Sequence, residues 1–134
     1  MEVKERTGKY KAQSIHYLEN AFLSMEAGNV EKASEFLWGS MAEALKAVAA
    51  SRSRELRHHR EIGEYARELA RQLGDEAISD VFGNASYLHT NFYEAELTIE
   101  EVYTYASRIK AIIGKLFDFI PKYDLEHKEE QWIG

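Results

Sequence analysis

The chain has 134 residues, with 17 basic and 23 acidic side chains and a formal net charge of −6. This balance argues against a non-specific binder of duplex DNA, which needs a basic surface to displace counterions. The absence of cysteine excludes disulfides, zinc sites with thiolate ligands and cysteine nucleophiles. We expect a cytoplasmic protein without a membrane span, because the first residues lack the apolar core of a signal peptide and no apolar run approaches ~20 residues.

The composition favours helices along the whole chain. Pro121 is the single proline, and hydrophobic residues make up 45% of the sequence, which is enough for a buried core. The sequence therefore predicts an all-α fold, a single up-and-down bundle of about five helices with antiparallel neighbours. The bundle is expected over residues 1–120, and residues 121–134 are expected to form a polar C-terminal tail.

The first two helices are predicted over residues 7–27 and 30–51. Apolar residues recur at spacings of three and four in both segments, which lines one helical face. Gly28 is a good helix terminator and Asn29 a good cap for the helix that follows. The second helix is the most apolar, with Glu35, Glu43 and Lys46 as a narrow polar stripe, so we expect it at the centre of the bundle.

The pattern breaks over residues 51–56 and resumes in a third helix over residues 57–73. Gly74 ends that helix, and a fourth helical element is predicted over residues 76–94. We expect a kink or a short break within it at Gly83-Asn84. The last helix begins after Thr98, which forms a capping box with Glu101, and it ends before Pro121.

A basic cluster between the second and third helices is the best functional lead. It comprises Arg52, Arg54, Arg57, His58, His59 and Arg60. Amides at a helix start attract anions, and arginine offers a forked donor that matches phosphate, so the cluster predicts a phosphate site for a nucleotide or an RNA backbone. The alternative is a solvated helix end paired with glutamates elsewhere in the chain.

A second lead is the segment around residues 88–96. His89, Asn91, Tyr93 and Glu96 are predicted to lie in a cleft or at a partner interface. The alternative is a histidine at the edge of the core that is hydrogen-bonded to a neighbour. We expect no metal and no cofactor, because adjacent His58 and His59 diverge on a helix and the motifs of zinc and di-iron sites are absent.

Three segments resemble the archaeal PaREP family: Gly28 to Ala33, Leu37 to Ala49 and Leu88 to Glu94. That family is similar to the HEPN superfamily, and the resemblance implies a bundle of four to five helices, often dimeric, linked to nucleotide or RNA binding. Many HEPN domains are RNases with an arginine, a polar residue and, four to six residues later, a histidine. Arg52-Ser53 precedes His58 and His59 at this spacing, and Arg54-Glu55 precedes His59, although in those RNases the motif lies near the final helices.

Three functions follow, in order of preference. The first is a homodimeric bundle that binds a nucleotide or single-stranded RNA through the basic cluster. The second is a protein-interaction or scaffold bundle without a small ligand. The third is a metal-independent RNase, with Arg54, His58 and His59 as the candidate catalytic residues.

Overall fold

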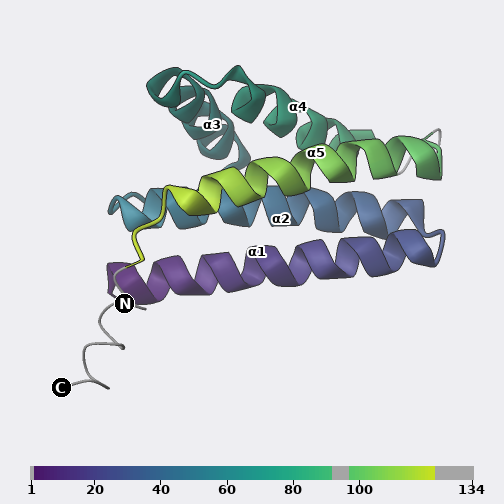
Figure 1. Ribbon diagram of the computed structural model, residues 1–134, viewed down its shortest axis with the longest axis horizontal. Helices are drawn as coiled ribbons and strands as arrows, with labels where there is room; N and C mark the ends of the chain where they lie inside the picture. Colours follow the sequence, from purple (N-terminus) through teal and green to yellow (C-terminus); the bar gives the residue numbers. More distant parts are fainter. Residues whose placement is uncertain (1, 92–96, 123–134) are drawn as a thin grey trace.

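The computed structural model describes residues 2–91 and 97–122 of the chain (Figure 1). Within these two stretches all regular structure is α-helical, which confirms the predicted all-α bundle. The five helices of this part of the chain are α1 (Val3–Glu26), α2 (Val30–Ser51), α3 (His59–Leu73), α4 (Glu76–Asn91) and α5 (Ile99–Asp118). None of these helices is long and apolar enough to cross a membrane.

Local capping groups account for most of the helix ends. The Asn29 side chain accepts a hydrogen bond from the Lys32 amide at 3.0 Å, and α2 spans the predicted residues. Gly74 ends α3 in the left-handed conformation, with φ at 63°. The predicted capping box is confirmed, since the Glu101 amide donates to the Thr98 hydroxyl at 3.2 Å and the Glu101 carboxylate accepts from the Thr98 amide at 3.4 Å.

Some predicted boundaries differ from the structure. α1 begins at Val3 rather than at Thr7, and α3 begins at His59, so that Arg57 precedes the helix instead of lying in its first turn. A short break at Gly83-Asn84 is absent, because α4 continues through both residues, and the alternative expectation of a kink there stays a prediction. Phe82 and Ala85, on either side of this pair, are buried, and their packing offsets the helix penalty of one glycine, about 1 kcal/mol.

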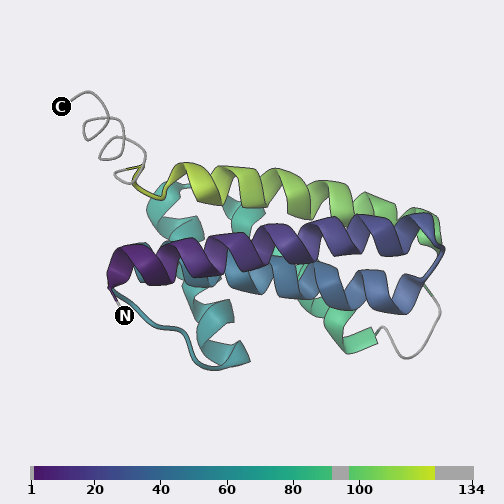
Figure 2. The same cartoon turned by 90° about the horizontal axis from the view of Figure 1, so that it is seen from below.

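α2 is the central helix, as predicted. It pairs with α1 in antiparallel fashion along its length, and it also packs against α3, α4 and α5. α3 is inclined to α1, α2 and α5 in both views (Figures 1 and 2) and packs mainly against α4. The largest fully buried side chains of α2 are those of Leu37, Met41, Leu45 and Val48.

Small side chains let α1 approach α2 closely. The Ser14 hydroxyl donates to the Ser40 carbonyl at 2.7 Å in a fully buried contact. A Cβ at the neighbouring Gly39 would lie 2.9 Å from the Tyr17 ring. Gly39 therefore makes room for Tyr17, and this contact shapes the pocket described next.

Candidate functional site

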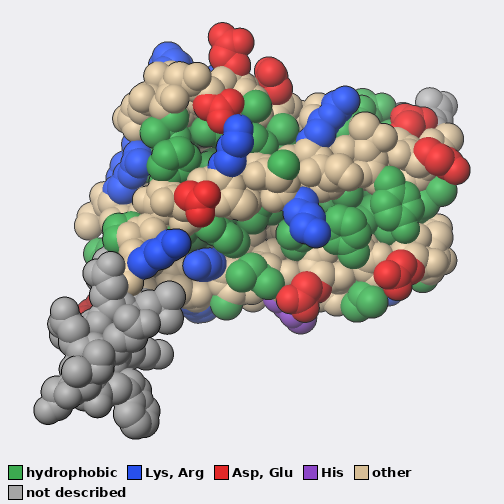
Figure 3. Space-filling view, in the orientation of Figure 1, with side chains coloured by type: hydrophobic (Ala, Val, Ile, Leu, Met, Phe, Trp, Pro, Cys, Tyr) green, Lys and Arg blue, Asp and Glu red, His purple; other side chains and the backbone are tan. Residues whose placement is uncertain are grey.

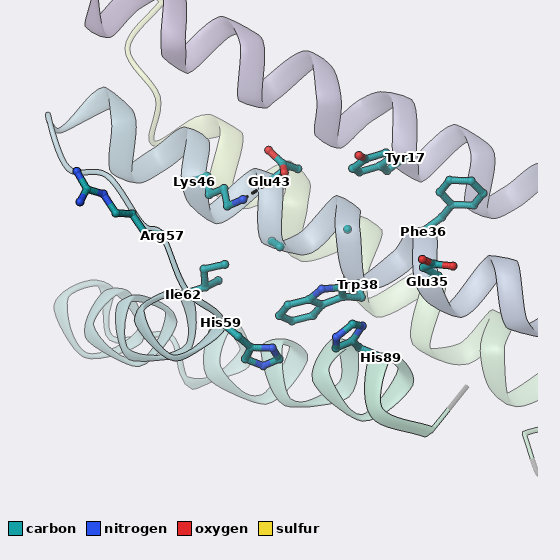
Figure 4. A pocket seen from close by; sticks show the side chains of 12 residues that line it. Tyr17, Glu35, Phe36, Trp38, Glu43, Lys46, Arg57, His59, Ile62 and His89 are labelled. Carbon is teal, nitrogen blue, oxygen red and sulfur yellow. Dashed lines mark hydrogen bonds and ion pairs between the residues drawn. The ribbon is translucent and has the colours of Figure 1, made fainter. Parts of the chain in front are cut away.

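A pocket of about 540 Å³ opens along α2 (Figure 4). This volume falls within the range of roughly 300–1,000 Å³ that is typical of small-molecule sites. Its walls come from α1, α2, α4, the loop before α3 and the start of α3, which include segments far apart in the sequence. The lining residues are Tyr17, Glu35, Phe36, Trp38, Gly39, Ala42, Glu43, Lys46, Arg57, His59, Ile62 and His89.

Three stacked rings form one wall of the pocket. The Trp38 indole lies 4.4 Å from the His59 imidazole at an interplanar angle of 17°, and 4.9 Å from the His89 imidazole at 22°. The two imidazoles are 5.8 Å apart, which is too close for rings on opposite faces of the indole. Both histidines therefore cover the same indole face, and Figure 4 shows them together on the α3 and α4 side of Trp38.

Phe82 supports this stack from α4. Its ring meets the edge of Trp38 at 5.7 Å and that of His59 at 6.0 Å, in T-shaped geometry. Gly63 of α3 leaves space for this ring, since a Cβ there would lie 3.1 Å from the Phe82 Cε2. The Ser86 hydroxyl lies 3.4 Å from the His59 Nε2. Residues of α3 and α4 thus hold the stack in place.

The opposite wall combines aromatic and charged side chains. Tyr17 and Phe36 are tilted against each other with centroids 6.0 Å apart. Figure 4 shows Tyr17 and Glu43 on the side of Trp38 away from the histidines. Gly39 and Ala42, two small residues of α2, line the space between the walls.

Two cations line the pocket in different surroundings. The Lys46 ammonium lies 3.4 Å from the Glu43 carboxylate, and their side chains are 25% and 16% exposed. Arg57 pairs with Glu55 at 3.5 Å, but its side chain is 71% exposed. The first pair is therefore partly desolvated and is screened less by salt than the second.

The structure divides the predicted basic cluster. Arg57 and His59 line the pocket. The other four members are directed to polar partners outside it: Arg52 donates to Gln72 at 3.1 Å, Arg54 forms an ion pair with Glu68, His58 lies 3.9 Å from Glu61, and Arg60 lies 3.2 Å from Glu64. Arg54 and His59, two of the candidate catalytic residues, thus have separate surroundings.

Two of these arginines interact with the side chain of Tyr65. The Arg54 guanidinium lies 4.7 Å from the centre of the Tyr65 ring. Burial raises the pKa of the Tyr65 hydroxyl, and the positive charges of Arg52 and Arg54 partly oppose this shift. The contact ties the loop before α3, where Ser53 has a φ of 61°, to the buried face of α3.

The second predicted group is described only in part. His89 lines the pocket and stacks on Trp38. The Asn91 side chain, Tyr93 and Glu96 lie outside the described parts of the chain. The histidines of the two sequence leads, His59 and His89, therefore belong to one site.

Trp38 is a pocket residue that the sequence analysis did not single out. Trp38 is half-buried rather than fully buried. One signal was available: Trp38 is followed by Gly39 and Ala42, so a large ring lies next to small residues on the same helix. In the described residues, no cluster of three or more histidine and carboxylate side chains that could hold a metal ion is found.

A model of the archaeal PaREP1/PaREP8 family matches residues 9–113. The chain belongs to this family. The match covers every residue that lines the pocket, so the site lies within the region that defines PaREP1/PaREP8 membership. No curated protein and no solved structure matches this PaREP1/PaREP8 chain significantly. The likeness of PaREP1/PaREP8 to the HEPN superfamily stays a prediction.

Proposed function

We propose that this protein binds a nucleotide, free or as part of single-stranded RNA, with the base stacked in the pocket beside Trp38. The observation that carries the proposal is the orientation of the Trp38 indole. His59 and His89 cover one of its faces, and Figure 4 shows the other side directed toward Tyr17 and Glu43. Protein sites for single-stranded RNA commonly use aromatic rings as stacking platforms for unpaired bases.

The stack supports the proposal energetically as well. Stacking of a base on an aromatic side chain contributes about 1–3 kcal/mol. Trp38 already has fixed ring contacts with His59, His89 and Phe82, so little side-chain entropy is lost when a base binds. A pre-organised ring of this kind is a better platform than an exposed, rotating one.

Arg57 is the group we assign to the phosphate. It lines the pocket, its guanidinium is exposed, and its ion pair with Glu55 is of the surface type that contributes little to stability. Exchanging Glu55 for a phosphate therefore costs little, while the forked guanidinium forms paired hydrogen bonds with phosphate oxygens.

The test uses the fluorescence of Trp38. The chain has two tryptophans, so Trp132→Phe leaves Trp38 as the single indole. Titration with the four nucleoside monophosphates and with a short single-stranded RNA is expected to quench this fluorescence, because a stacked base contacts the indole. Calorimetry should show binding to Trp132→Phe and its loss in Trp38→Leu/Trp132→Phe.

The phosphate contact has a matched control. Arg57→Ala should weaken binding by at least about tenfold, in line with the loss of one charge-assisted hydrogen bond, and the loss should shrink at high salt. Arg60→Ala removes an exposed arginine that pairs with Glu64 outside the pocket, and it should leave affinity unchanged. Unchanged Trp38 fluorescence with every mononucleotide and with RNA would refute the proposed function.

A second candidate is self-association through the outer face of α1. Leu23 is 61% exposed and Ile15 is 40% exposed, which is high for large apolar side chains on one helix. Leu23 also lines a groove between α1 and α5. Figure 3, in the orientation of Figure 1, shows hydrophobic side chains gathered on the surface in the region between these two helices. The groove is lined by Leu18, Glu19, Phe22, Leu23, Glu26 and Lys110. We propose a second copy of the chain as the partner.

A further inference from the structure

Stacking on Trp38 and a phosphate contact with Arg57 do not explain why an ion pair between Glu43 and Lys46 lies in the pocket wall. It lies in the pocket wall on the most apolar helix of the bundle, and both side chains are largely withdrawn from water. Removing a charged pair from water has a desolvation penalty that often exceeds the attraction between the charges. The position of this pair in the pocket wall is therefore better explained by a role in the pocket than by a contribution to stability.

The Glu43 carboxylate also retains unused hydrogen-bonding capacity. Its Oε1 accepts from the Lys46 ammonium at 3.4 Å, and no other donor to this carboxylate is found among residues 2–91 and 97–122. An ionised carboxylate offers about four acceptor positions and an ammonium three donors. The pair therefore presents an acceptor beside a donor to whatever enters the pocket.

We propose that the pocket selects guanine, with Glu43 and Lys46 as the residues that determine this specificity. The inference rests on the proposed function and names its ligand class. The Watson–Crick edge of guanine has two adjacent donors, N1–H and the N2 amino group, next to the acceptor O6. A carboxylate accepts from both donors, and an adjacent ammonium donates to O6.

The other bases match this pair less well. Adenine and cytosine each have one amino donor, and the ring nitrogen beside it is an acceptor that would face the carboxylate. Uracil has a single donor between two carbonyl acceptors. When a ring acceptor faces a desolvated carboxylate, neither group has a hydrogen-bond donor. Leaving polar groups unpaired in this way weakens the binding of the wrong base strongly.

The position of the pair along α2 agrees with a base stacked on Trp38. Glu43 lies about 7.5 Å further along the helix axis than Trp38, at 1.5 Å per residue, which is comparable with the length of a purine. Figure 4 shows Glu43 and Lys46 beyond Trp38 along α2. Arg57 lies beyond Lys46, on the loop before α3, in the same view, and its exposed guanidinium would leave a bound phosphate in contact with solvent.

Glu35 provides a matched control. It is the other carboxylate that lines the pocket, but it is exposed and lies beside Phe36, on the other side of Trp38 from Glu43 (Figure 4). An exposed carboxylate remains hydrated, so it contributes little to discrimination between bases. Glu35→Gln should leave base preference unchanged, whereas Glu43→Gln should remove it.

The experiment compares GMP, IMP, AMP, CMP and UMP in the Trp132→Phe protein by Trp38 quenching. We expect GMP to bind at least about tenfold more tightly than AMP, CMP or UMP, as one charge-assisted hydrogen bond predicts. IMP lacks the N2 amino group and should fall between GMP and AMP. Glu43→Gln should reduce the GMP to AMP ratio about tenfold, and the folded state of each variant is checked by circular dichroism.

Removing Glu43 alone leaves Lys46 partly buried without its carboxylate, so the double variant Glu43→Gln/Lys46→Gln serves as the version without a stranded charge. It should bind GMP and AMP with similar affinity. Equal affinity for GMP and AMP in the Trp132→Phe protein, or an unchanged ratio in both variants, would overturn guanine selection while leaving nucleotide binding in place. Failure of every nucleotide to quench Trp38 would overturn both.

Discussion

The indole of Trp38 and the imidazole of His59 are stacked with their centroids 4.4 Å apart, and this contact joins the central helix α2 to the first residue of α3. His58, the preceding residue, has a side chain that is 76% exposed beside Glu61. Two adjacent histidines of the basic cluster thus have different surroundings. The pair offers a direct comparison between a histidine of the pocket and one of the surface.

His59→Ala should weaken nucleotide binding severalfold and reduce the free energy of unfolding by about 1 kcal/mol, because an aromatic pair contributes roughly 0.5–1.5 kcal/mol. His58→Ala should change neither quantity measurably. Urea unfolding and Trp38 quenching in the Trp132→Phe protein measure the two effects. Equal effects from both substitutions would contradict the assignment of His59 to the stack.

Gly39→Ala should destabilise the protein by about 1–3 kcal/mol, because the added Cβ would lie 2.9 Å from the Tyr17 ring and force it to move. Gly83→Ala is the control, since a Cβ there meets no atom within 4 Å and alanine favours the α4 helix. That variant should be more stable by up to about 1 kcal/mol. Thermal and urea unfolding of both variants provide the comparison.

Ionisation of the Tyr65 hydroxyl should reduce the free energy of unfolding at high pH. Burial raises the pKa of its hydroxyl above the ordinary value of 10.0, so the folded state holds the proton more tightly than the unfolded state. The protonated Tyr65 hydroxyl therefore contributes fully to the free energy of unfolding below pH 10, and this contribution is lost as the pH rises toward the raised pKa. Urea midpoints from pH 8 to pH 11 should therefore decline less in Tyr65→Phe than in the unchanged chain.

The exposed Tyr103 controls for general effects of alkaline pH. Tyr103→Phe should show the same decline as the unchanged chain. If the urea midpoint of Tyr65→Phe declined as steeply with pH as that of Tyr103→Phe, the pKa of the Tyr65 hydroxyl would be the same in the folded and unfolded states, which would contradict this prediction.

Thr98→Ala should reduce the free energy of unfolding by about 1 kcal/mol, because the Thr98 hydroxyl accepts from the Glu101 amide at the start of α5. Thr104→Ala removes a hydroxyl that donates to the Glu100 carbonyl within the same helix, and it should change stability by no more than about 0.5 kcal/mol. Chemical unfolding at neutral pH distinguishes a capping effect from a general effect of threonine removal.

Leu23→Gln should convert a dimer to a monomer in sedimentation velocity runs, since Leu23 is the most exposed large apolar side chain described on α1. Tyr103→Gln alters an exposed ring on α5 and should leave the dimer intact. A monomeric unchanged chain at high micromolar concentration would exclude the proposed self-association.

Local signals in the sequence were sufficient for most of the fold. Asn29, Gly74 and Thr98 act on backbone groups within a few residues of themselves, so the helix ends that they specify were predicted correctly. A break at Gly83-Asn84 does not occur, because the burial of Phe82 and Ala85 on either side of this pair outweighs the local helix penalty of one glycine. Helical periodicity also placed α2 at the centre, because a wide apolar arc is buried when several helices pack around it.

The sequence alone determined that the chain forms one helical bundle with a basic loop before α3, because spacing and capping depend on near neighbours in the chain. Only the tertiary structure decided that Trp38, His59 and His89 form one stack, and that Arg57 rather than Arg54 lines the pocket. These residues come from different segments, and the packing of α3 and α4 against α2 brings them together. A pattern of neighbours along the chain carries no information about which side chains meet across that interface.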